Sequence, residues 1–180
     1  MSALPNPPDS VPDMLVTTYL HMTDPAQFRP SFLNDPRVVV RRLDRADVRF
    51  YRFLYSAVGE RWRWRDRLLL SDDELHHILA QPHTTVYVLY YDGAPAGYVE
   101  LAHDGDTMEI AYFGLRPEYM GQGLGKHLLS YGIAQAWAAG ARRVWLHTCN
   151  LDSPRALDNY LKRGFKVFDV RQKPMPDRYC

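Results

Sequence analysis

Hydrophobic and polar positions repeat with two different periods along this chain, and each period predicts one kind of element. Residues 84–91, 96–102 and 108–115 are rich in β-branched and aromatic residues and are separated by turn-forming segments. This arrangement predicts three consecutive antiparallel strands. The same composition predicts further strands over residues 37–43, 142–148 and 165–171, and an additional strand over residues 14–22.

Four segments instead carry apolar residues at helical spacing. The clearest covers residues 123–139, where leucine, isoleucine and tryptophan side chains form one apolar stripe that Gly140 is suited to end. Ser71 and Glu74 are typical of a capping box, which predicts a helix over residues 72–81. Two more helices are expected, from a cap at Asp44 to about residue 58 and from Pro154 to about residue 163. Strands and helices alternate in the second half, which predicts an α/β or mixed α+β sheet.

A length of 180 residues favours one main domain. Residues 1–13 hold four prolines and few large apolar side chains, so we expect a flexible N-terminal arm. Residues 14–35 are expected to form an N-terminal extension that contributes the additional strand. The main domain is then expected to cover residues 36–180.

The composition is that of an ordinary soluble protein, with 46% hydrophobic and 24% charged residues and a formal net charge of +1. A charge so close to zero gives no basic field for nucleic acid or an anionic membrane. The start of the chain lacks the pattern of a signal peptide, and no apolar run approaches the ~20 residues that span a bilayer. Two cysteines indicate no disulfide framework. We therefore expect a cytoplasmic protein with a small-molecule partner.

Three glycines, Gly121, Gly123 and Gly125, lie between the strand that ends at residue 115 and the helix that follows. The first N–H groups of a helix have no intrahelical partner, and glycines let an anion approach them closely, so a phosphate site is one interpretation. A tight turn with close packing is the other. The spacing fits neither the Walker pattern nor the dinucleotide-binding fingerprint.

Three motifs together resemble those of the GNAT superfamily of acetyl-CoA-dependent N-acetyltransferases. The stretch Met-Gly-Gln-Gly-Leu-Gly at 120–125 is similar to the family's Arg/Gln-x-x-Gly-x-Gly/Ala motif, with Met120 in place of the usual polar residue. The stretches "GLRPEY" (114–119) and "ALDNYLKRGF" (156–165) resemble two further family motifs. The resemblance covers about residues 36 to 170.

The resemblance implies the GNAT fold, a central mixed, mostly antiparallel twisted sheet of six to seven strands flanked by about four helices. It also implies acetyl-CoA as cosubstrate. The residues it assigns to the cofactor are Phe113, Gly114 and Leu115 at the strand end, and Gly121, Gln122, Gly123, Leu124, Gly125 and Lys126 in the pyrophosphate loop. Ser153 stands where the family often has an asparagine that contacts the cofactor, and the nearby Asn150 and Asp152 are alternatives for that contact.

Acetyl transfer to an amine needs a base, and two glutamates are candidates. The resemblance places Glu109 at the position of a catalytic glutamate. If Asp104 and Gly105 are the centre of a two-residue turn, Glu100 lies directly opposite Glu109, and two carboxylates so close would raise the pKa of one. A four-residue loop would keep both on one face, whereas a three-residue loop would not. Water as the base, or two solvent-facing glutamates, are the alternatives.

The remaining candidates concern the leaving group and the acceptor. The resemblance implies that Tyr160 protonates the leaving thiolate; its alternative is a core aromatic. It also implies that Trp62, Trp64 and Arg65 shape the acceptor pocket; they could equally form a packing plug or a homodimer contact. His147 and Cys149 share a strand face without a third ligand nearby, which favours core packing and no metal site.

Taken together, the sequence predicts an enzyme that transfers an acetyl group from acetyl-CoA to a primary amine of a small molecule, by direct attack in a ternary complex. Two alternatives stay open. The chain could be a non-catalytic acyl-CoA-binding sensor, or an acetyltransferase acting on protein lysines or N-termini.

Overall fold

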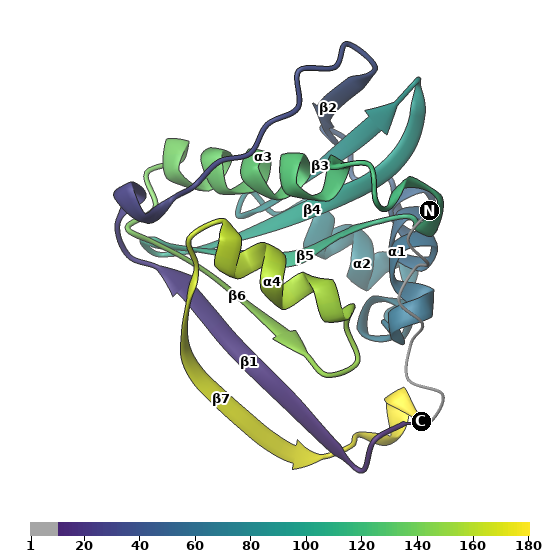
Figure 1. Ribbon diagram of the computed structural model, residues 1–180. Coiled ribbons are helices and arrows are strands. Elements are labelled where there is room, and N and C mark those ends of the chain that lie inside the picture. The colour runs from purple at the N-terminus through teal and green to yellow at the C-terminus, as the bar shows by residue number, and fades with distance from the viewer. Residues whose placement is uncertain (1–10) are drawn as a thin grey trace.

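The computed structural model describes residues 11–180, in which a single seven-stranded sheet has the order β2-β3-β4-β5-β6-β1-β7 (Figure 1). All neighbouring strands are antiparallel except β5 and β6. The mixed, mostly antiparallel sheet that the sequence predicts is therefore confirmed. The strands are β1 (Met14–Met22), β2 (Val38–Arg42), β3 (Thr84–Tyr91), β4 (Ala94–Asp104), β5 (Thr107–Leu115), β6 (Arg143–Cys149) and β7 (Lys166–Pro174).

The strand predicted over residues 14–22 is β1, and it lies inside the sheet between β6 and β7. Leu20 and Met22 are completely buried there, which explains why this strand is held between two others. Residues 14–35 thus contribute to the main sheet itself. Most of the arm expected over residues 1–13 lies outside the described residues.

Four α-helices cover the two faces of the sheet: α1 (Val48–Gly59), α2 (Asp72–Leu79), α3 (Leu124–Ala138) and α4 (Pro154–Lys162). Figure 1 shows α3 and α4 on one face, with α1 and α2 behind the sheet. Two clusters of buried side chains correspond to these faces. Leu128, Leu129 and Ile133 anchor α3 in the first cluster, and Tyr51 and Leu54 anchor α1 in the second.

The start of α1 differs from the sequence prediction. Asp47, rather than Asp44, caps the helix, because its carboxylate accepts a hydrogen bond from the backbone N–H of Phe50 at 2.9 Å. Asp44 instead lies in the preceding loop, where it forms an exposed ion pair with Arg42. Two aspartates three positions apart gave equally good local caps, and the fold uses the second.

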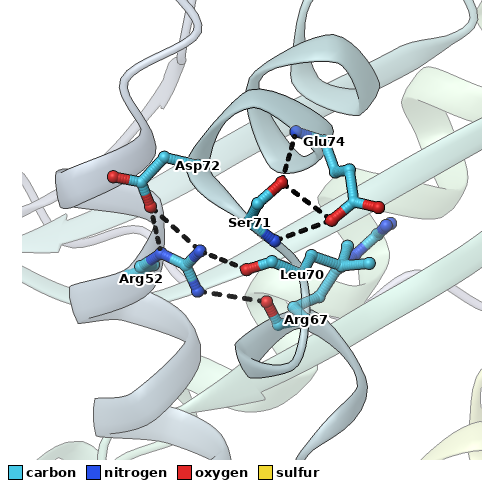
Figure 2. Close-up of polar contacts among 6 residues, drawn as sticks. All are labelled: Arg52, Arg67, Leu70, Ser71, Asp72 and Glu74. Carbon is cyan, nitrogen blue, oxygen red and sulfur yellow. Dashed lines mark hydrogen bonds and ion pairs between the residues drawn. The ribbon is translucent and has the colours of Figure 1, made fainter.

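The capping box at the start of α2 is confirmed, and it lies in a polar network that holds the loop before it (Figure 2). The Ser71 hydroxyl accepts from the backbone N–H of Glu74, whose carboxylate accepts from the N–H of Ser71. The guanidinium of Arg52 on α1 donates to the carbonyl oxygens of Arg67 and Leu70. This network fixes the segment that carries Arg67 beside the sheet.

The register of the β4–β5 hairpin also differs from the prediction. Asp104 pairs with Thr107, so that Gly105, with φ +60°, is the first central residue of the turn rather than the second. Positive φ is required at the first position of the tight turns that suit hairpins. Glu109 therefore lies opposite Ala102, and a bulge next to Glu100 places Glu100 opposite Tyr112. The expected direct pairing of Glu100 with Glu109 is wrong.

Candidate active site

The two parallel strands β5 and β6 separate soon after they begin. Their pairing extends only from Thr107 with Arg143 to Glu109 with Trp145, and no later pair joins them within residues 11–180. A cavity of about 540 Å³ lies at this opening and is lined by residues of both strands, of β1 and β4, of α1, α3 and α4, and of the segments that connect them. The separation leaves one edge of β5 without a strand partner, so its backbone is accessible to a bound molecule.

One end of this cavity is formed by the start of α3. Gly123 is the N-cap, with φ +79°, and no side chain in the described part of the chain caps the helix. Met120, Gly121 and Gly125 line the cavity. The unpaired N–H groups and the positive end of the helix dipole therefore face a space that an anion could enter.

The other predicted loop residues do not contribute to the lining of the cavity, as far as the described residues show. They are Gln122, Gly123, Leu124 and Lys126. Leu124 is buried in the core, and the Gln122 amide donates to the carbonyl of Glu118. The loop thus presents mainly its backbone to the cavity.

The strand end predicted for the cofactor, Phe113, Gly114 and Leu115, lines the middle of the cavity. A Cβ atom at Gly114 would lie 2.5 Å from a methyl carbon of Val58 on α1. Glycine is therefore needed for α1 to pack this closely against β5. Ser153, the N-cap of α4, lines the same cavity.

Tyr160 on α4 is both a core residue and part of the cavity lining. Its ring contacts Phe113 and Phe165, and its side chain is largely buried. Burial raises the pKa of the Tyr160 phenol well above its usual value, and the nearby Asp152 adds to this. The phenol is consequently protonated at neutral pH and able to donate a proton.

Glu109 and His147 face each other across the separation of β5 and β6. The Glu109 carboxylate is 25% exposed, and its Oε1 lies 3.8 Å from Nε2 of His147. Burial raises the pKa of Glu109, the charge of Glu100 raises it further, and the charge of Arg67 opposes both. The prediction that His147 packs in the core is wrong, because its side chain is 48% exposed and lines the cavity.

Glu100 is almost completely buried and lies beneath the cavity. Its carboxylate accepts hydrogen bonds from the Tyr51 hydroxyl at 2.5 Å and from the Arg67 guanidinium at 2.6 Å. Burial raises the pKa of Glu100, while Arg67 and Tyr51 lower it. Among the described residues, Arg67 lines the cavity and Glu100 does not.

The end of the cavity opposite α3 is formed by the segment after α1. Trp62 and Trp64 line it, whereas Arg65 is not among the described lining residues and donates to the carbonyl of Trp64. Trp64 also contacts Tyr55 and Tyr112. Trp64 therefore both lines the cavity and packs against neighbouring aromatic rings, so the two interpretations are compatible for this residue.

Among the further lining residues, Asp66 and Tyr179 were not found by sequence reasoning, and Tyr179 lies next to Arg63 in the fold. The Arg63 guanidinium donates to the carbonyl of Tyr179, and the Asp66 carboxylate accepts from the Tyr179 hydroxyl and from Arg178. The C-terminal segment thus closes one side of the cavity. No local motif marks these residues, since they meet only in the folded chain.

Two properties of the described residues bear on the chemistry. Burial raises the pKa of the Cys149 thiol to about 12, so this pocket cysteine stays protonated and is a poor nucleophile. Residues 11–180 contain no group of three histidine, cysteine or acidic residues placed to hold a metal ion. No helix in that range is long and apolar enough to cross a membrane.

Known proteins that are similar to this chain indicate its family. Residues 46–165, two thirds of the chain, match the model of the acetyltransferase (GNAT) family. An uncharacterised N-acetyltransferase of Mycobacterium tuberculosis is 33% identical over 103 residues, which make up 57% of this chain and 65% of that protein. The match thus spans slightly less than two thirds of that relative.

A second relative is similar in sequence, and a solved structure is similar in fold. A Bacillus subtilis protein, provisionally named as a ribosomal protein bS18-alanine N-acetyltransferase, is 29% identical over 107 residues, 59% of this chain and 70% of that one. The crystal structure of the PaiA N-acetyltransferase of Thermoplasma acidophilum in complex with coenzyme A has a TM-score of 0.55 and 19% identity. The superposition covers 77% of this chain and 99% of the other, which shows a shared fold.

Proposed function

Because the chain belongs to the acetyltransferase (GNAT) family, we propose that it transfers an acetyl group from acetyl-CoA to a primary amine of a small molecule. One observation carries the proposal: a single cavity connects the uncapped start of α3, the Tyr160 phenol and the Glu109 carboxylate. The anion site would bind the phosphate groups of acetyl-CoA, and the proton donor and proton acceptor would serve the aminolysis of its thioester.

The donor half of the site lies toward α3 and α4. In the proposal, the backbone N–H groups around Gly121 and Gly125 bind the pyrophosphate of acetyl-CoA, and the pantetheine arm follows the unpaired edge of β5. Backbone binding of this kind does not need a polar side chain at Met120. The thioester then lies beside the rings of Phe113 and Tyr160, which contact each other and both line the cavity.

The acceptor half lies between Glu109 and the segment containing Trp62. Glu109 removes a proton from the bound ammonium group, and the neutral amine attacks the thioester carbonyl directly. When the tetrahedral intermediate collapses, the carbon–sulfur bond breaks, Tyr160 donates its proton to the thiolate, and the tyrosinate takes up the second proton that the amine nitrogen loses as the amide forms. The protonated thiol of Cys149 argues against an acetyl-cysteine intermediate.

The name of the Bacillus subtilis relative favours a second candidate, in which the acceptor is the N-terminal amine of a protein. Both candidates use the same donor site and the same proton transfers. They differ in whether the cavity must hold a free amine or the end of an extended chain. The acceptor screen must therefore contain both kinds of compound.

The test is release of free CoA from acetyl-CoA, measured with a thiol reagent in the presence of pooled primary amines or pooled short peptides. We expect release that depends on a small amine and is confirmed by the mass of the acetylated product. Tyr160→Phe should lower turnover about 10-fold or more without weakening acetyl-CoA binding. Tyr131→Phe is the matched control, because Tyr131 lies on α3 against Tyr87 and away from the lining described for the cavity.

Three results would contradict the proposal in different ways. Release only with peptides would favour the protein acceptor. Tight acetyl-CoA binding without release for any amine would favour a sensor. Equal turnover in Tyr160→Phe and Tyr131→Phe would return Tyr160 to a packing role.

A further inference from the structure

His147 lies where a proton would leave the active site. We propose that His147 is a proton relay: it takes from Glu109 the proton that Glu109 removes from the acceptor ammonium, and passes it to solvent. This inference rests on the proposed function, since it assigns a step to the same site.

The geometry comes from the register of the two parallel strands. Glu109 pairs with Trp145, so His147, two positions further along β6, has its side chain on the same face of the sheet as Glu109. The strands separate just beyond this point, which leaves Nε2 of His147 facing Oε1 of Glu109 at 3.8 Å. A side-chain movement of roughly 0.6 Å or more brings this pair to hydrogen-bond distance.

A relay needs the residue that passes the proton on to be more accessible than the residue that first takes it up. Both side chains line the cavity, and His147 is the more accessible of the two, with 48% of its side chain exposed against 25% for Glu109. The imidazole ring is held by Tyr19 of β1, which pairs with His147 and has its ring centroid 5.7 Å away. A proton can therefore pass outward through one fixed ring.

The proton balance of the step is simple. The acceptor R–NH₃⁺ and the Glu109 carboxylate give R–NH₂ and the carboxylic acid. The acid then transfers its proton to Nε2 of the neutral His147 ring, and the imidazolium releases a proton to water or buffer. Glu109 returns to its ionised form before the next turnover, and no other reactant is needed.

The charges around His147 decide its state at neutral pH. Glu109 of β5 faces it, Asp152 follows β6, and Asp66 lies in the segment after α1. Burial lowers the pKa of His147 below its usual value, and this outweighs the two aspartates, which raise it. The ring is thus neutral at neutral pH and ready to accept a proton, and it becomes charged and blocked as the pH falls through its pKa.

The experiment compares His147→Gln with His21→Gln at saturating acceptor and acetyl-CoA. His21 is the matched control, because it also lies in the sheet, stacks on Phe168, accepts a hydrogen bond from Arg143 and is not among the described residues that line the cavity. We expect His147→Gln to lower kcat about 10-fold or more with both KM values nearly unchanged. Added imidazole should restore part of that loss, and the rate should come to depend on buffer concentration. The acid limb of the pH profile should also change.

The outcomes separate the relay from the proposed function. If the parent protein acetylates no amine or peptide, the proposed function fails and the relay with it. If the parent is active and His147→Gln has the same kcat and pH profile as the parent, only the relay is overturned. A loss of activity in His147→Gln that imidazole does not restore, accompanied by a higher acceptor KM, would also overturn the relay and assign the ring to substrate positioning.

Discussion

Replacing Arg67 with methionine should leave the charge of Glu100 buried without its partner. Glu100 is 1% exposed and Arg67 16%, and the two groups are joined at 2.6 Å. Removal of one member of a buried ion pair costs about 3–5 kcal/mol, because the remaining charge stays desolvated. Since Tyr51 still donates to Glu100, we expect the lower end of that range, about 3 kcal/mol at neutral pH. For a chain of this length this corresponds to a fall in Tm of about 6–12 °C.

The penalty should depend on pH in a defined direction. Burial already raises the pKa of Glu100, and Arg67 is the main group that lowers it, so Arg67→Met should raise this pKa further. A carboxyl group with a raised pKa binds its proton more tightly in the folded than in the unfolded state. The variant should therefore approach the parent in stability near pH 4 and lose stability as the pH rises through the unfolded pKa and toward the folded one.

Thermal unfolding of five proteins at about pH 4.5 and about pH 8 tests this reasoning. They are the parent, Arg67→Met, Glu100→Gln and the double variant, with Arg65→Met as a control that removes a neighbouring arginine bonded only to a backbone carbonyl. The double variant should be more stable at pH 8 than Arg67→Met alone, since it contains no buried charge. A penalty below ~1 kcal/mol at pH 8, or one independent of pH, would refute the argument.

Three further predictions concern the donor site, the base and the fold. Glu109→Gln should lower kcat about 100-fold while calorimetry gives an unchanged Kd for acetyl-CoA, and a changed Kd with unchanged kcat would contradict its role. Gly125→Val should weaken acetyl-CoA binding about 10-fold in the same calorimetric assay. The control Ala138→Val, at an exposed position at the far end of α3, should leave binding unchanged. If the two variants bound acetyl-CoA equally well, the anion site would be refuted. Gly164→Ala should cost roughly 2 kcal/mol or more in urea denaturation, because φ is +106° and the new Cβ would meet a backbone carbonyl oxygen at 1.9 Å. Gly93→Ala, with φ +81° and open space, should cost only about 1 kcal/mol, and equal costs would show that the close contact is unimportant.

Much of the fold could be predicted because its elements are set by local patterns. The meander of β3 to β5, the helix α3 with its glycine start, and the capping box of α2 all depend on residues near in sequence. The details that were wrong depend on choices between local alternatives. Asp44 and Asp47 are both good caps, and Gly105 could occupy either central position of its turn. Packing of the whole helix or hairpin decides such choices, and a turn displaced by one residue, together with the bulge next to Glu100, was enough to move Glu100 away from Glu109.

The candidate site divides in the same way. The donor half is built from two motifs that are each continuous in the sequence. The lining residues Gly121 and Tyr160, one in each motif, could therefore be named from the sequence. The acceptor half is built from segments that meet only after folding. Asp66 and Tyr179 are 113 positions apart, and their contact requires the C-terminal segment to reach the loop after α1. Strand alternation placed His147 on one face of β6, but only the separation of β5 from β6 shows that this face lines a cavity.

The buried pair and the cavity are electrostatically connected, which gives the pair a role besides stability. The negative charge of Glu100 raises the pKa of Glu109, and the positive charge of Arg67 lowers it. Burial contributes the largest share of the increase, so the shape of the cavity sets the approximate strength of the base and the pair adjusts it. A buried ion pair is weak evidence for stability, because its desolvation cost offsets much of the attraction. Its electrostatic interaction with the proposed base therefore favours a second reason for a charge in this core: Glu100 and Arg67 adjust how readily Glu109 accepts a proton.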